Sequence, residues 1–187
     1  MNPNPSTNSQ DIIASSMLRA GVPRSMARPD FSLAVEFGKP GEYAKTWCAK
    51  AAPFFSEGRM LLLNSNDNKS AHVAGRMLYG IARGLVLSRV SCRVVPLSVI
   101  VNSMVSRENQ AVLGELEDLD ALLIPDFYAE GKPPPFTAEV MSRLEGWLFS
   151  QATRAGQGLV LMSDAPALHA CSWWARWLLS SFEDRCS

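Results

Sequence analysis

MLLLNSNDNKS, residues 60–70, is the stretch from which the fold is predicted. Its first part, Met60–Asn64, is a short apolar run bounded by polar residues, which is typical of a buried β-strand. After a polar turn, apolar residues recur at three- and four-residue intervals, a spacing that predicts an amphipathic helix over residues 70–88. These apolar positions are Val73, Ala74, Met77, Leu78, Ile81 and Leu85.

The strand-then-helix pattern recurs through the rest of the chain. Further strands are predicted at Cys92–Leu97, Ala121–Ile124 and Gly158–Met162, and helices at Val99–Leu119, Thr137–Ala155 and Ala167–Phe182. Strand–helix units in series imply a parallel sheet with helices on both faces, because right-handed crossovers carry each helix back over the sheet. The pattern therefore predicts a single α/β domain over residues 11–187.

The residues before the first strand have a weaker pattern. Residues 1–10 are rich in Asn, Pro and Ser, which predicts a flexible N-terminal arm. A short helix is expected over Asp11–Leu18, followed by an irregular connection at residues 21–31. Helical spacing returns over Gly41–Phe55, and Pro53 is expected to end this helix.

Composition narrows the classes of protein to which the chain can belong. With 187 residues, 47% of them hydrophobic, the chain is long enough for one buried core. Its 18 basic and 18 acidic side chains cancel, so no overall field attracts nucleic acid or an anionic membrane. The N-terminus is polar, and no apolar run approaches the length of a membrane span. We expect a cytoplasmic protein that makes no membrane contact.

The cysteines point to the same compartment. Cys48, Cys92, Cys171 and Cys186 lie far apart, form no CxxC pair and are accompanied by only two histidines. This spacing argues against both a zinc site and a disulfide framework. We therefore expect no metal site and a reducing environment.

The polar turn after the first strand is where a P-loop would lie. A P-loop has glycines there, because backbone N–H groups must crowd around phosphate at a helix N-terminus. In the pattern GxxxxGK[ST], Lys69 and Ser70 stand at the lysine and hydroxyl positions. Asn68 and Leu63 occupy the two glycine positions, and Asp67 brings negative charge towards any phosphate. The alternative interpretation is a capped helix start with a solvated lysine.

Two later strands carry polar residues at their ends. DALLIPDF is a buried strand ending in an acid, as in ATPases where one carboxylate organises Mg²⁺ and the next helps to position water. Pro125 stands at the first of these positions and Asp126 at the second. LVLMSDAP delivers Ser163 and Asp164 to the strand edge where α/β sheets place ligand groups. The alternative is that these residues are solvated strand ends and ordinary turn formers.

Four segments in order, GVPRSMARPDF, LLLNSNDNKS, LDALLIPDF and GLVLMSDAP, resemble the ATPase domain of bacterial and phage helicase loaders of the DnaC/IstB kind. The resemblance covers roughly residues 12–182 and implies an AAA+/RecA-like P-loop NTPase core. In that family the last three segments are Walker A, Walker B and sensor 1. A reduced C-terminal part is also implied, because the sequence ends before the family's fifth strand.

The resemblance assigns a role to each matching residue. Lys69 is the phosphate lysine, Ser70 the magnesium-ligating hydroxyl, Asp126 the second Walker B acid, and Ser163 or Asp164 the sensor. Both Walker A glycines and the first Walker B acid are replaced, however, and the last helix ends in LLSSFED without the usual arginine finger. We expect no cofactor, and ATP with Mg²⁺ only if the chain is a divergent enzyme, for which Asp126 is the candidate catalytic residue.

Two groups of residues are candidates for contact surfaces. Trp173 lies off the stripe that Trp174, Trp177 and Leu178 form on the last helix, so it is a candidate partner anchor, although these tryptophans more simply pack on the sheet. The candidate nucleic-acid residues are Arg76, Arg83, Arg89 and Arg93. A solvated helix face is the simpler interpretation of these arginines.

The leading hypothesis is a non-catalytic, loader-like interaction protein of phage or mobile-element type. It would bind and modulate a replicative helicase, an initiator or a related ATPase. A sheet core that has lost its catalytic groups most plausibly persists as a binding surface. Two alternatives stay open: a divergent ATPase of the helicase-loader type that uses Lys69, Ser70 and Asp126, and a DNA-binding module that uses the arginines.

Overall fold

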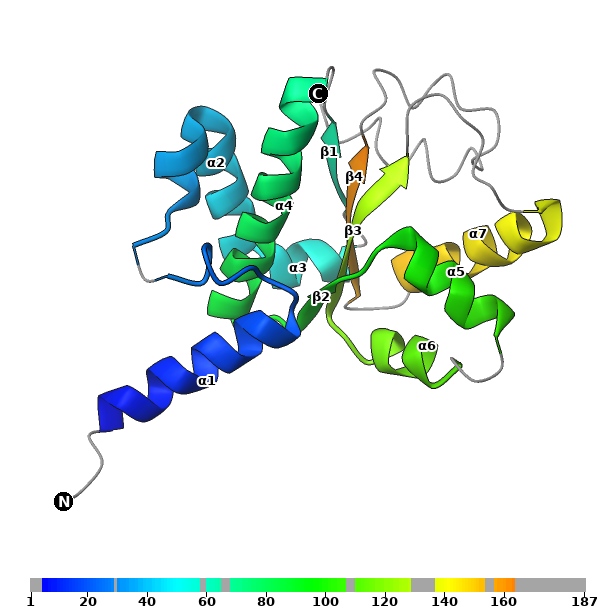
Figure 1. Cartoon of the computed structure of the whole chain (residues 1–187), viewed down its shortest axis with the longest axis horizontal. Helices are drawn as coiled ribbons and strands as arrows, with labels where there is room; N and C mark the ends of the chain where they lie inside the picture. Colours follow the sequence, from blue (N-terminus) through cyan, green and yellow to red (C-terminus); the bar gives the residue numbers. More distant parts are fainter. Residues whose placement is uncertain are drawn as a thin grey trace.

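A parallel β-sheet forms the centre of the molecule. The computed structural model describes residues 5–28, 30–57, 60–64, 68–106, 110–128, 137–153 and 157–163. Within them, a four-stranded sheet has the order β1-β4-β3-β2, and every neighbouring pair is parallel (Figure 1). The strands are β1 (Leu61–Asn64), β2 (Cys92–Val94), β3 (Ala121–Tyr128) and β4 (Gly158–Ser163).

Helices cover both faces of this sheet (Figure 1). One face carries α1 (Pro5–Arg19), α2 (Leu33–Ala49), α3 (Ala51–Ser56) and α4 (Asn68–Leu87), and the other carries α5 (Leu97–Val105), α6 (Gln110–Glu117) and α7 (Ala138–Thr153). Successive residues of β3 alternate between the faces, so Leu123 packs under α4 whereas Leu122 and Ile124 pack under α5 and α7. The predicted α/β fold, a parallel sheet with helices on both faces, is confirmed.

The central strand β3 is interrupted near its end. Ile124 pairs with Leu161 of β4, but the next pair is Tyr128 with Ser163, so the register shifts between them. Pro125 lies in this interval, and it has no N–H to donate to the sheet ladder. The irregularity therefore falls where the sequence cannot continue the ladder.

The N-terminal helices differ from the prediction. The first begins at Pro5 rather than at Asp11, because proline fits the first turn of a helix, where its missing N–H is not needed. The second begins at Leu33 and has a kink at Gly38, where φ is +59°. Pro53 does not end a helix: it lies in the first turn of α3, and the break falls at Lys50 instead.

The middle of the chain also departs from its predicted bounds. The strand expected at Cys92–Leu97 ends at Val94, because Pro96 caps α5 and Leu97 is the first residue of that helix. The helix expected at Val99–Leu119 is two helices, with Ser106 in an extended conformation after α5. The last predicted helix, Ala167–Phe182, lies outside the described residues.

The interior of the α4 side holds two buried thiols. Cys48 and Cys92 donate to the carbonyl oxygens of Ile81 and Ala82 at 3.7 and 3.5 Å. Burial raises the pKa of each thiol from 9.0 to about 12, and the neighbouring Cys48 and Asp120 add to the effect at Cys92. Both cysteines are free.

None of the helices in the described part of the chain is long and apolar enough to cross a membrane.

Candidate functional site

The candidate phosphate site lies at the carboxyl edge of the sheet. Asn64 is the last residue of β1 and Ser163 the last of β4, and the two are register partners. Helix α4 begins at Asn68, so Lys69 and Ser70 belong to its first turn. The structure therefore brings the backbone of the Walker A-like and sensor-like segments to one edge, where a helix N-terminus favours an anion. Asp67 and Asp164 lie outside the described residues.

The first glycine position of the P-loop pattern is not part of a loop. Leu63 stands inside β1, in register with Met162 of β4. Its backbone is therefore extended, and it is not in the turn whose N–H groups would surround a phosphate. The second position, Asn68, is the first residue of α4.

Asp126 bonds to the backbone of a neighbouring helix. Its Oδ1 accepts a hydrogen bond from the Leu97 N–H at 2.7 Å, at the first residue of α5. The four N–H groups that begin a helix have no partners within it, so a carboxylate here satisfies a donor and complements the helix dipole. The position of the missing metal-organising acid holds Pro125, which has no carboxylate at all. The Walker B-like segment thus contributes a helix cap from a separate strand.

Two of the four candidate arginines connect α4 to α2 or to the segment just before α2. Arg76 forms an ion pair with Glu36 at 3.0 Å, and Arg28 also reaches Glu36, at 3.3 Å. Arg83 donates to the Arg28 carbonyl oxygen at 3.3 Å and lies over the Phe31 ring. Burial lowers the pKa of Arg83, opposed by the charge of Asp30. Arg76 therefore joins α4 to α2, and Arg83 joins α4 to the connection that precedes α2.

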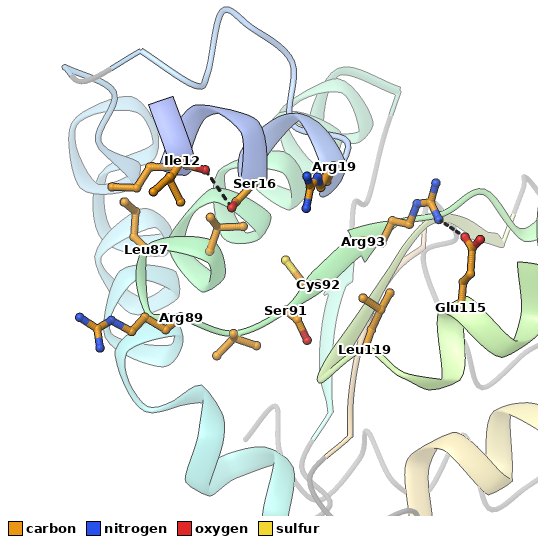
Figure 2. A pocket seen from close by; sticks show the side chains of 13 residues that line it. Ile12, Ser16, Arg19, Leu87, Arg89, Ser91, Cys92, Arg93, Glu115 and Leu119 are labelled. Carbon is orange, nitrogen blue, oxygen red and sulfur yellow. Dashed lines mark hydrogen bonds and ion pairs between the residues drawn. The ribbon is translucent and has the colours of Figure 1, made fainter. Parts of the chain in front are cut away.

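The other two arginines line a groove at the C-terminal end of α4 (Figure 2). This α1–β2 groove is bounded by α1, the end of α4, β2 and α6, and Arg19, Arg89 and Arg93 line it. Arg93 forms an ion pair with Glu115 of α6 at 3.3 Å. The four arginines therefore do not form the single basic patch proposed as the DNA-binding alternative.

The groove was missed in the sequence because its walls come from distant segments. The sequence did contain one signal, the adjacent aliphatic residues Ile12 and Ile13. Adjacent residues point in different directions from a helix, so both cannot lie at the centre of one buried face. Both remain exposed. Arg19 completes the wall seven residues later than Ile12, on the same face of α1.

The remaining expectations from the sequence concern metal ligands and Trp173. No cluster of three or more His, Cys, Asp or Glu side chains suited to a metal occurs in the described ranges. Trp173, the candidate partner anchor, lies outside them.

Comparison with known proteins gives one solved structure to report. No family model and no curated protein matches the chain. Among solved structures, the crystal structure of DnaI is similar over 79% of this chain and 71% of that chain, with 16% sequence identity and a TM-score of 0.46.

Proposed function

We propose that this chain is a non-catalytic, helicase-loader-like interaction protein that binds and modulates a replicative helicase, an initiator or a related ATPase. The observation that carries the proposal is the bond between Asp126 and the Leu97 N–H. The remaining Walker B-like carboxylate is used to hold α5, and Pro125 replaces the acid that would organise Mg²⁺.

The Walker A-like segment supports the same proposal. Leu63 is an extended strand residue, so the backbone donors of a glycine turn are not available at its position. Without those donors and without a metal ligand, phosphate charge has little to neutralise it. The parallel sheet and its helices are intact, so their surfaces are available to bind a partner protein.

A pull-down of the purified helicase and initiator of the host tests the partner assignment. Wild type should retain one of them, and a Lys69→Ala, Asp126→Asn double variant should bind within about tenfold of wild type, or ~1.4 kcal/mol. Asn at position 126 keeps an oxygen acceptor for the Leu97 N–H, so the variant separates chemistry from stability. Retention of neither protein by folded wild type removes the replication assignment.

A divergent ATPase is the second candidate, because Lys69 and Ser70 do stand in the first turn of the helix that follows β1. Calorimetry with Mg-ATP separates the two candidates. If the chain is a non-catalytic interaction protein, Mg-ATP should not bind, or should bind with a dissociation constant above about 1 mM, which corresponds to a binding free energy weaker than about 4 kcal/mol. A micromolar dissociation constant that Lys69→Ala abolishes would establish the enzyme instead.

A further inference from the structure

The α1–β2 groove has an apolar lining that the fold leaves uncovered. It encloses about 1000 Å³ (Figure 2). Ile12 and Ile13 of α1 are 60% and 40% exposed, and Leu87 at the end of α4 is 48% exposed. Adjoining aliphatic side chains in one concave surface mark an interaction site more often than isolated ones do.

Positive charge lines the same groove. Arg19 and Arg89 are exposed, and neither has an acidic partner within the described parts of the chain. Arg93 is partly neutralised by Glu115, the one carboxylate among the lining residues that the structure describes. The groove therefore offers two guanidinium groups with no carboxylate partner among the described residues, beside an aliphatic surface, and guanidinium is the cation best matched to a carboxylate.

The edge of β2 beside the groove is partly closed. The Val94 N–H, which would donate to an added strand, already donates to the carbonyl oxygen of Ala20, just after α1, at 2.9 Å. A ligand must consequently be recognised through side chains and not through a continuous backbone ladder. Nucleic acid is disfavoured because none of the described residues that line the groove is aromatic, so they give bases no stacking surface.

We propose that the α1–β2 groove binds a segment of a partner protein in which aliphatic side chains are flanked by aspartate or glutamate. The aliphatic side chains would contact Ile12, Ile13 and Leu87, and the carboxylates would pair with Arg19 and Arg89. The inference deepens the proposed function, on which it rests for the existence of a protein partner. It places the contact away from the phosphate-site edge, since the α4–β2 turn lies at the opposite end of the strands.

The probe is a set of short fluorescent synthetic peptides with leucine or isoleucine flanked by glutamate, and matched peptides with glutamine in place of glutamate. Fluorescence anisotropy with the full chain should show binding of the acidic peptides that weakens as salt is raised. Arg19→Gln with Arg89→Asn should weaken it about tenfold, as expected for the loss of two exposed ion pairs. Asn suits position 89 because Arg89 has a φ of +62°.

Matched variants outside the groove control for overall charge and apolar surface. Arg24→Gln with Lys45→Gln removes the same charge from exposed positions elsewhere and should leave peptide affinity unchanged. Ile12→Ser should weaken binding severalfold, whereas Val35→Ser, at a site that is 84% exposed on α2, should not. Thermal melts establish that each variant is folded. In wild type, added acidic peptide should protect residues 12–19 and 86–93 from hydrogen exchange, a measurement that needs no variant.

Several outcomes overturn the inference. They are failure of every acidic peptide to bind, equal binding of the glutamine peptides, or equal losses in the control variants. Binding of single-stranded DNA that the groove variants weaken, without peptide binding, assigns the groove to nucleic acid. If acidic peptides bind but no helicase or initiator is retained in the pull-down, the groove stands and the replication assignment fails.

Discussion

The Oδ1 atom of Asp126 on β3 lies 2.7 Å from the backbone nitrogen of Leu97, and this hydrogen bond ties the start of α5 to the centre of the sheet. The two residues belong to neighbouring strand–helix units, because β2 leads into α5 and pairs with β3. A residue that resembles a catalytic acid in the sequence is thus a structural contact in the fold.

Asp126→Ala is expected to destabilise the protein by about 0.5–2 kcal/mol, the usual cost of removing a helix cap. Asp126→Asn should lose less, because its side-chain oxygen still accepts from the Leu97 N–H. Urea unfolding measures both. The control is Asp118→Ala, at an exposed site, which should stay within about 0.5 kcal/mol of wild type. An unchanged midpoint for Asp126→Ala would show that the bond adds nothing to stability.

The two buried thiols predict a loss of stability at alkaline pH. Folding raises the pKa of Cys48 and Cys92 to about 12, so the native state holds protons that the unfolded chain releases from about pH 9 upwards. The contribution of the two thiols to the free energy of unfolding is complete below about pH 9 and declines as the pH rises towards about 12. Unfolding should therefore need less urea at about pH 10 than at about pH 8. The decrease in the urea midpoint between these two pH values should be smaller in the double variant Cys48→Ala, Cys92→Ala than in wild type. An equal decrease in wild type and the double variant would show that other groups cause the loss of stability.

Two strand leucines are expected to respond differently to charge. Leu123 on β3 is 0% exposed, so Leu123→Asp buries an unpaired carboxylate that costs several kcal/mol, about the whole stability of a domain. Leu62 on the edge strand β1 is only half-buried, and Leu62→Asp should leave a folded but weakened protein. Circular dichroism with urea unfolding distinguishes these outcomes. Cooperative, wild-type-like unfolding of Leu123→Asp would contradict the assigned strand register.

Gly158, at the start of β4, lies directly beneath the ring of Phe55, and a Cβ atom there would overlap the ring. Gly158→Ala should therefore cost about 1–3 kcal/mol through overpacking. Gly114→Ala is the matched control: nothing lies near that position on α6, and alanine should stabilise the helix by about 0.5–1 kcal/mol. The two midpoints should move in opposite directions, and movement in the same direction would contradict this packing.

Periodicity in the sequence was sufficient for the core of the fold. The run at Leu61–Asn64 and the helix that follows it were predicted within two residues at either end. This worked because a buried strand and an amphipathic helix each record their surroundings in consecutive side chains. The break between α5 and α6 was missed, because continuous helical spacing does not show where the chain must turn.

The candidate site was predicted only as far as local sequence extends. The helix start at Asn68–Ser70 followed from the polar turn after a buried strand, and the weakness of the P-loop match was visible in Leu63 and Asn68. The use of Asp126 was not visible, because its partner is 29 residues away. That distance closes only when β2 and β3 pair.

The sequence by itself determined the alternation of strands and helices from Leu61 onwards, most of the buried face of α4, and that no glycine stands at the two glycine positions of the P-loop pattern. Only the tertiary structure decided which of the four candidate arginines lie together. Arg76 pairs with Glu36, which is 40 residues earlier, whereas Arg89 and Arg93 line the α1–β2 groove together with Arg19. Helical and strand periods are properties of neighbouring residues, but an ion pair or a groove depends on which distant segments packing brings together.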